Sequence, residues 1–497
     1  MTEELIALLG GNIVGRVRKL PRGKFAFIYD PAWRGARDAY PLSLSMPLAA
    51  EEHGSDRIEA FLWGLLPDNE IVLDRWARKF QVSARNVFAL IAHVGEDCAG
   101  AVQFVLPARL DAVLNGGTEE IEWLDEHDVA RRLAALRADH AAWRLPRDTG
   151  QFSLAGAQPK TALLFENGRW GIPSGRVPTT HILKPPTGQF DGHAENEHIC
   201  LGLARSLGLP TASSQIMRFD EEIAIVVERY DRLRVGNEII RVHQEDVCQA
   251  LGIMPTKKYQ NEGGPGVTDV VELLRTHSSA SVGDVQDFID AIAFNWLIAG
   301  PDAHAKNYSL LISYGPRVRL APLYDIASIL PYDDVDQYKV KLSMKIGGEY
   351  RLRDIRPSGW RRLARDVRID ADLLIGRVST MAERLPDLVS MVRARASDEG
   401  LHEPIVERLA ERLTERALTC HRMLAYGFCL VANLSIMAAP KTPLVTLSAR
   451  EFPALLAIEG HLRKCNVSAT RGSTTLYDAS SAAANFEIYS IDYNNLR

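Results

Sequence analysis

The spacing of apolar residues changes once along the chain, near Val247. Before that point the apolar runs are short and are separated by turn residues, as in Gly-Gly-Asn at residues 10–12, between residues 5–9 and 13–17. Glycine and asparagine accept the positive φ angles that tight hairpin turns need. Beyond Val247 the apolar residues recur at helical spacing, for example in residues 288–297. This order predicts an α+β chain whose β-rich and helical halves meet at a cleft.

Strands are expected where short apolar runs are bounded by turns. The strongest hairpin signal is Asn-Gly at residues 167–168, between residues 161–165 and 169–172. Residues 108–117 have the composition of a linker. The other expected strands are residues 25–29, 41–48, 179–184, 223–227, 308–313 and 318–320, and the expected helices are residues 129–143, 195–206, 288–297 and 404–418.

Composition limits the class of protein. Apolar residues make up 46% of the 497 residues, and the net charge of −5 argues against a broadly basic nucleic-acid binder. We expect no signal peptide, and the most apolar run, residues 428–440, is too short to span a bilayer. The 6 cysteines form no CxxC pair, so we expect reduced thiols in a cytoplasmic protein.

A loop of small residues precedes the Asn-Gly hairpin. It contains Ala155, Gly156 and Ala157 and ends at Lys160. Small residues let the backbone approach a ligand and let its N–H groups point at phosphate oxygens. The loop is neither a Walker A loop nor GxGxxG, so on its own an ordinary loop between strands is the simpler interpretation.

Lys184 closes an apolar strand that follows this loop and hairpin. Protein kinases hold the nucleotide phosphates with a lysine in this place and pair it with a glutamate of the next helix. Glu197 lies on the helix expected next. The alternatives are an edge lysine that faces solvent and one surface carboxylate among many.

The most specific pattern is Asp302-x-x-x-x-Asn307, directly after a helix that ends at Gly-Pro. At this spacing a kinase places the Asp that accepts the hydroxyl proton and an Asn whose carbonyl binds Mg²⁺. Asp325 follows two expected strands, where kinases place a second Mg²⁺-binding Asp, although Asp-Ile-Ala replaces DFG. Each signal alone also fits a turn or a helix cap. Their shared kinase order predicts phosphoryl transfer.

At these same residues the sequence resembles the HipA family of bacterial serine/threonine kinase toxins. The similarity covers roughly residues 5–427. It implies a two-lobed protein-kinase-like fold, with a β-rich N-terminal part that carries an extra small subdomain and an all-α C-terminal lobe. The matching segments are residues 41–48, 65–69, 152–162, 179–184, 228–232, 244–249, 263–266, 302–307 and 324–326.

The resemblance implies ATP and Mg²⁺ as cofactors and a role for each site residue. Phosphorylation of the family's loop serine silences the kinase, since about −1.5 to −2 charges where anionic phosphates must bind would repel ATP. By this resemblance Asp302 is the catalytic base, Asn307 and Asp325 bind Mg²⁺, Ala155, Gly156, Ala157, Lys160, Lys184, His304 and Lys306 contact the nucleotide, Glu228 and Tyr230 offer backbone groups to adenine, and Ser153 is autophosphorylated.

The family also implies partners. Members of this length phosphorylate an aminoacyl-tRNA synthetase, the glutamate enzyme, and arrest translation. A small DNA-binding antitoxin holds them inactive, and the pair represses its own operon, so operator DNA is the third implied partner. Two alternatives stand beside this hypothesis. One is a small-molecule phosphotransferase, because antibiotic kinases also use an Asp and an Asn at this spacing. The other is a largely non-catalytic co-repressor, against which the intact Lys184, Asp302, Asn307 and Asp325 argue.

Two residues depart from the family pattern. Ala303 stands where the family commonly has glycine, and Pro159 replaces a more usual polar residue of the loop. We expect four parts, and we assign no chemistry to the first. They are a β-rich subdomain (1–108), a lobe with the phosphate loop and the ATP lysine (109–250), a helical lobe with the catalytic loop (251–428) and a tail without an assigned role (429–497).

Overall fold

The computed structural model describes most of the chain. The described residues are 3–115, 121–143, 153–175, 177–186, 192–236, 238–315, 317–336 and 338–438, with side chains to residue 425. The chain divides into one unit of Met1–Val431 and a second of Ala432–Arg497. Of the expected tail at residues 429–497, residues 429–438 continue the helix that begins at Pro404, and residues 439–497 lie outside the described residues.

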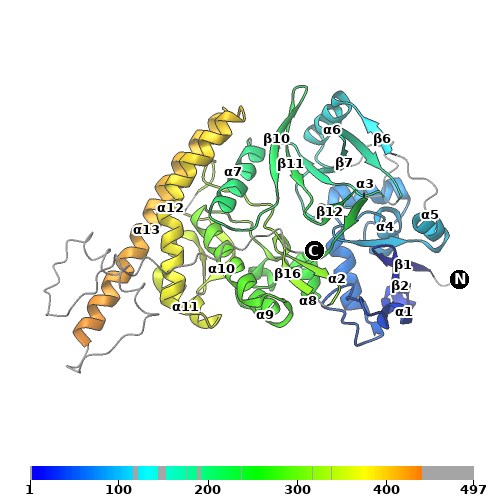
Figure 1. The fold of residues 1–497 in the computed structure, drawn as a ribbon, viewed down its shortest axis with the longest axis horizontal. Coiled ribbons are helices and arrows are strands. Elements are labelled where there is room, and N and C mark those ends of the chain that lie inside the picture. The colour runs from blue at the N-terminus through cyan, green and yellow to red at the C-terminus, as the bar shows by residue number, and fades with distance from the viewer. Residues whose placement is uncertain are drawn as a thin grey trace. The chain divides into compact units, whose positions relative to one another are not determined.

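The first hundred residues form a five-stranded antiparallel sheet with helices packed on it (Figure 1, blue). The strands are β1 Glu4–Leu9, β2 Asn12–Lys19, β3 Phe25–Tyr29, β4 Glu52–His53 and β5 Val102–Val105, and the helices are α1 Pro31–Arg34, α2 Ser55–Leu65, α3 Glu70–Phe80 and α4 Val87–Val94. The sheet order is β4-β3-β2-β1-β5. The predicted hairpin is confirmed, with Gly10 (φ 55°) and Gly11 (φ 81°) in the turn. Phe27 of β3 shares one core with Phe61 and Leu90 of the helices.

Residues 41–48 do not form the expected strand. They make a turn with a single bridge between Ser43 and Met46. The alternation serves a different purpose, because polar groups of this turn bind the second half of the chain. The Ser43 and Ser45 hydroxyls donate to Gln249 O at 3.2 and 2.9 Å. A docking turn and a half-buried strand thus share one sequence pattern.

Residues 108–117, which were expected to form a linker, also differ from the prediction. It contains helix α5 Leu110–Asn115, whose Val113 is buried beside Ile6 and Leu8 of β1. The sheet therefore has apolar side chains on both faces, and α5 covers the face that α2 and α4 leave open.

The second sheet has six strands in the order β10-β11-β9-β7-β8-β6. Its elements are β6 Ile121–Leu124, α6 Glu126–Ala138, β7 Thr161–Glu166, β8 Arg169–Pro173, β9 His181–Lys184, α7 His193–Ser206, β10 Ser214–Phe219 and β11 Glu222–Glu228. The predicted Asn-Gly hairpin is confirmed, because Asn167 (φ 51°) and Gly168 (φ 75°) join β7 to β8. Lys184, the last residue of β9, pairs with Ile225 of β11.

The remaining described residues are mostly helical, and small two- and three-stranded sheets lie among the helices. The elements are β12 Arg232–Val235, β13 Glu238–Arg241, β14 His243–Asp246, α8 Val247–Leu251, α9 Val267–His277, α10 Ser281–Leu297, β15 Ser309–Ser313, β16 Arg317–Leu320, β17 Lys341–Ile346, β18 Glu349–Arg351, α11 Pro357–Asp366, α12 Ala371–Asp398 and α13 Pro404–Ala438. The strands expected at residues 308–313 and 318–320 are present as β15 and β16. The helix expected at residues 288–297 is the C-terminal part of α10. No helix in the described part of the chain is long and apolar enough to cross a membrane.

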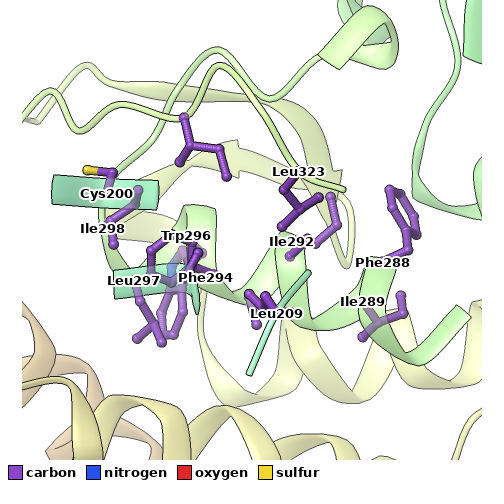
Figure 2. Close-up of a cluster of buried hydrophobic side chains, with 14 of the residues drawn as sticks. Cys200, Leu209, Phe288, Ile289, Ile292, Phe294, Trp296, Leu297, Ile298 and Leu323 are labelled. Atoms are coloured by element: carbon purple, nitrogen blue, oxygen red, sulfur yellow. The ribbon is translucent and has the colours of Figure 1, made fainter. Parts of the chain in front are cut away.

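The core of the helical half lies directly behind the end of α10. Figure 2 shows Phe288, Phe294 and Trp296 of α10 with Cys200 of α7 and Leu323, and these side chains belong to one buried cluster. After α10 the chain turns sharply at Gly300, where a Cβ would lie 2.6 Å from Asn295 Oδ1. The packed helix thus fixes the point at which the next loop begins.

Candidate active site

Lys184 and Glu197 form a buried ion pair, which is one of the two alternatives that the sequence left open for Glu197. Lys184 Nζ donates to Glu197 Oε1 at 2.8 Å and to Oε2 at 3.0 Å, and it also donates to Asp325 Oδ1 at 2.8 Å. Burial alone would lower the pKa of Lys184, but the Asp325 and Glu197 carboxylates outweigh burial and raise the pKa. A charged lysine is therefore fixed between a helix and the loop after β16.

Asp325 is held in a left-handed backbone conformation, with φ 57°. Burial would raise its pKa, but Lys184 and then Lys160 hold the pKa of this carboxyl well below its usual range. The chain beyond it is fixed to α7, since Asn196 Nδ2 donates to Ser328 O at 2.7 Å and Ser328 N donates to Asn196 Oδ1 at 3.0 Å. The carboxylate is therefore ionised and has a defined direction.

The loop after α10 carries Asp302 and Asn307. Asn307 Nδ2 donates to the backbone oxygen of Asp302 at 2.7 Å, which leaves the amide oxygen of Asn307 for another partner. The Tyr259 hydroxyl donates to Asp302 Oδ1 at 2.8 Å. Partial desolvation by the surrounding cleft and the Asp325 charge raise the pKa of Asp302, while 65% of its side-chain surface remains exposed. Asp302 is thus an anchored carboxylate that solvent and a substrate can reach.

The two residues between Asp302 and Asn307 that were expected to contact the nucleotide are both buried. Burial, and then the Lys258 charge, lower the pKa of His304 to about 3, so its ring is neutral near pH 7. The ring lies edge-on to Tyr259, with 5.0 Å between centroids. Lys306 Nζ donates to Asp68 Oδ1 at 2.6 Å. In this structure the Lys306 ammonium is therefore engaged by the N-terminal subdomain.

The loop of small residues forms one wall of the cleft. The Ser153 hydroxyl is fully buried and donates to Leu65 O at 2.8 Å. Gly156 has φ 101°, and its oxygen accepts from Asp68 N at 3.0 Å. Lys160 Nζ donates to Ala155 O at 2.8 Å. Burial, and then the neighbouring Lys184, lower the pKa of Lys160 to about 8. The loop is thus docked on the N-terminal subdomain.

Glu228 is the last residue of β11 and Tyr230 lies just beyond it, at the junction of the two halves, and both line the same cleft. Between and after them lies a buried group of charges that sequence reasoning did not assign. Arg229 Nη2 donates to Asp231 Oδ2 at 2.8 Å, and Arg232 Nη2 donates to Asp97 Oδ1 at 2.9 Å. Each of these side chains is no more than 9% exposed.

We name this group the hinge network: Asp97, Arg229, Asp231, Arg232 and Arg241. Asp97 comes from the turn before β5, and Arg241 Nη2 lies 3.3 Å from Asp97 Oδ1. Burial would raise the pKa of Asp97, but Arg232 and Arg229 hold it well below its usual range. The charged Arg-Tyr-Asp-Arg stretch was visible in the sequence, but its partner Asp97 lies more than a hundred residues away, and only the fold joins them.

Most of these groups surround one cleft with a volume of about 960 Å³, whereas Asp97, Arg232 and Arg241 of the hinge network lie outside its lining. Its lining includes the predicted Ala155, Gly156, Ala157, Lys160, Lys184, Glu228, Tyr230, Asp302, His304, Lys306, Asn307 and Asp325. Ser153 lies behind the loop, outside the lining. Among the described residues no three His, Cys, Asp or Glu side chains gather into a metal site by themselves.

The first hundred residues, to which we assigned no chemistry, contribute Asp68 to the lining of the cleft. Asp68 lies beside Asn69, which caps α3 by accepting from Ile71 N and Val72 N. Asparagine is a preferred residue at the start of a helix, so the local sequence accounts for Asn69. It gave no indication of Asp68, whose partners belong to the helical half.

Two lobes around a cleft, with a strand lysine paired to a helix glutamate on one side and an Asp–Asn loop on the other, define a protein-kinase-like phosphotransferase. The model of the HipA-like C-terminal domain matches residues 152–391, and that of the HipA N-terminal domain matches residues 5–105. The chain belongs to the HipA family and is an enzyme of the serine/threonine protein kinase class.

Relatives of known name agree with this assignment. Serine/threonine-protein kinase toxin HipA of Shewanella oneidensis is 30% identical over 416 residues, which are 81% of this chain and 91% of that protein. The protein Y4mE of Sinorhizobium fredii is 35% identical over 415 residues, 82% of this chain and 96% of that protein. A chain in the solved complex of Shewanella oneidensis HipA, HipB and its operator DNA matches with a TM-score of 0.72 and 28% identity, covering 84% of this chain and 97% of that chain.

Proposed function

We propose that this chain is a kinase toxin that transfers the γ-phosphate of ATP to a serine of a protein in the cytoplasm. The observation that carries the proposal is the bonded set of Lys184, Glu197 and Asp325 in the cleft that also contains Asp302 and Asn307. Phosphoryl transfer needs mainly positioning and neutralisation of charge, and this set supplies both.

The reaction follows from these positions. The serine oxygen forms a bond to the γ-phosphorus, and the bond from that phosphorus to the oxygen it shares with the β-phosphate breaks, so that ADP leaves. The serine proton passes to the free oxygen of the Asp302 carboxylate, because the Tyr259 hydroxyl already occupies Oδ1. In this proposed mechanism Lys184 and Lys160 hold the phosphate oxygens, and Glu228 and Tyr230 offer backbone groups to the adenine.

The residues present fit Mg²⁺ as the cation. The amide oxygen of Asn307 is free because its NH₂ group is bonded to Asp302 O, and the second oxygen of Asp325 is not used by Lys184. Mg²⁺ prefers one or two protein oxygen ligands together with phosphates and water. When bound, it would neutralise charge on the phosphates.

Autophosphorylation of Ser153 forms part of the proposal. The hydroxyl is buried and donates to Leu65 O, so the loop must leave the N-terminal subdomain before Ser153 can accept a phosphate. A phosphate on Ser153 would return to this site only at a high desolvation cost, because a group with about two negative charges would replace a fully buried hydroxyl.

For partners we propose a small DNA-binding antitoxin and, as the phosphorylated protein, an aminoacyl-tRNA synthetase of the glutamate type. The first is supported by the similarity to a chain in the solved complex of HipA, HipB and operator DNA. Contact with operator DNA would then occur through the complex with the antitoxin.

Intact mass spectrometry after incubation with Mg²⁺-ATP tests the function. Wild type and Asp302→Ala are compared, alone and with purified glutamyl-tRNA synthetase, and peptides are mapped. We expect one phosphate on Ser153 and one on the synthetase with wild type, and none with the variant. Phosphate on Ser153 but not on the synthetase would keep the kinase and exclude that substrate. No phosphate on any protein would contradict the kinase and favour a co-repressor.

A further inference from the structure

Asp68 connects the N-terminal subdomain to the catalytic side of the cleft. It lies between α2 and α3, and its side chain is 12% exposed. Oδ2 accepts from Lys258 Nζ at 2.8 Å, and Oδ1 accepts from Lys306 Nζ at 2.6 Å. The two ammonium groups hold the pKa of Asp68 below its usual value against the effect of burial. One ionised carboxylate therefore pairs with a buried lysine, Lys306, and a half-buried one, Lys258.

Both lysines are adjacent to groups that hold the proposed catalytic base. Lys306 directly precedes Asn307, whose side chain donates to Asp302 O. Lys258 directly precedes Tyr259, whose hydroxyl donates to Asp302 Oδ1. Ala305 N also donates to Lys258 O at 3.3 Å, which joins the two segments. Asp68 thus fixes the two chain segments that orient Asp302.

The backbone of the same residue supports the opposite wall. Asp68 N donates to Gly156 O at 3.0 Å, and Pro67 forms a bridge with Gly156. The phosphate loop and the loop that carries Asp302 are therefore both bonded to one residue of the N-terminal subdomain.

We propose that Asp68 is a positioning residue for phosphoryl transfer, which makes the N-terminal subdomain part of the catalytic centre. It restrains Lys258 and Lys306, so that neither ammonium pairs with the Asp302 carboxylate and the base stays free for the serine proton. This inference rests on the proposed function. Without the Asp68 charge two cations would remain in the cleft, where they attract the triphosphate but no longer hold the catalytic loop.

The test compares Asp68→Asn, Asp68→Glu and, as the matched control, Asp74→Asn. Asp74 is an exposed aspartate of α3 in the same subdomain, outside the cleft. The rate of phosphate incorporation from labelled Mg²⁺-ATP is measured together with the dissociation constant of ATP and the melting temperature. We expect Asp68→Asn to lower the turnover rate about tenfold to a hundredfold while ATP binds as tightly as in wild type or more tightly. Asp68→Glu keeps the charge and should recover most of the rate.

The outcomes separate the two proposals. An inactive wild type contradicts the proposed function, and the role of Asp68 falls with it. An active wild type with Asp68→Asn as fast as Asp74→Asn overturns only the role of Asp68. Weaker ATP binding in proportion to the lost rate, or no recovery in Asp68→Glu, would show a general structural role and would also overturn the inference.

Discussion

Two groups of buried charges lie next to each other in this protein, and they differ in what their charges contact. In the hinge network, every member's side chain is no more than 9% exposed, and the carboxylates and guanidinium groups bind one another and the backbone. In the group of Lys184, Glu197 and Asp325, which lines the cleft, the Asp325 side chain is 28% exposed. Asp302, across the cleft, is 65% exposed.

The difference distinguishes a network of charges that stabilises the fold from a site that can bind a ligand. Charges that are fully buried and mutually paired hold a fixed geometry, and loss of one partner leaves the others without compensation. Charges with an exposed side retain the capacity to bind a ligand. The hinge network should therefore respond to substitution mainly in stability, and the open carboxylates should respond mainly in activity.

The largest expected effect is on stability. Arg229→Met removes a cation that lies between Asp231 and Asp97, and we expect the free energy of unfolding to fall by about 3–5 kcal/mol. Urea denaturation measures this change. The control is Arg393→Met, which breaks an exposed pair with Glu407 and should cost less than about 1 kcal/mol. Equal losses in both variants would show that the hinge network does not contribute specially to the stability of the fold.

The next effect is on activity alone. Asp302→Asn removes the proposed base, and we expect the phosphorylation rate to fall by about 10²–10⁴-fold. Because the pKa of Asp302 is raised in the folded chain, its ionised form is disfavoured there, and the neutral amide should leave the melting temperature unchanged or higher. A large fall in melting temperature would show instead that Asp302 stabilises the fold.

A smaller effect is expected in the phosphate loop. Gly156→Ala puts a side chain at φ 101° and places its Cβ 2.6 Å from Lys160 Nζ. Displacement of this ammonium should weaken ATP binding by about tenfold, in addition to a backbone cost of about 1–2 kcal/mol. Isothermal titration with ATP measures the affinity. Gly168→Ala, in an open turn with φ 75°, carries the backbone strain without the contact and should leave the affinity unchanged.

The smallest effect concerns pH. Lys160, with a pKa of about 8, is mostly charged at pH 7 and mostly neutral at pH 9. Phosphate oxygens favour the charged form, so ATP affinity should fall as pH rises through 8, by about tenfold at pH 9. Titrations at several pH values test this. Lys160→Arg stays charged over the range, and its affinity should not follow the same curve; an identical curve would assign the effect to another group.

Local chemistry made much of the fold predictable. The turns at residues 10–12 and 167–168 need positive φ angles, and the close approach of Asn295 after α10 leaves room only for glycine at residue 300, so each has a signature in a few neighbouring residues. The prediction of a strand at residues 41–48 was wrong. Alternation of apolar and polar residues shows which side chains are buried, but it does not show which part of the chain covers them.

The candidate site was predictable where its order along the chain matters. Lys184, Glu197, Asp302, Asn307 and Asp325 keep a spacing that phosphoryl transfer imposes, and the structure brings them to one cleft. Asp68 and Asp97 could not be found in this way. Their importance comes from partners that are distant in sequence, so it depends on how two independently recognisable halves pack against each other.

The docking turn at residues 41–48 has a consequence for modularity. Its Leu44 N–H bonds Glu245, a buried carboxyl whose pKa is raised to about 8, chiefly by burial. The N-terminal hundred residues also supply Asp97 to the hinge network. A gene fragment that encodes only the kinase lobes would therefore expose Glu245 and leave three arginines without their shared carboxylate. The N-terminal subdomain therefore cannot be replaced by an unrelated domain without loss of these contacts. A recombination boundary near residue 108 should yield an insoluble product.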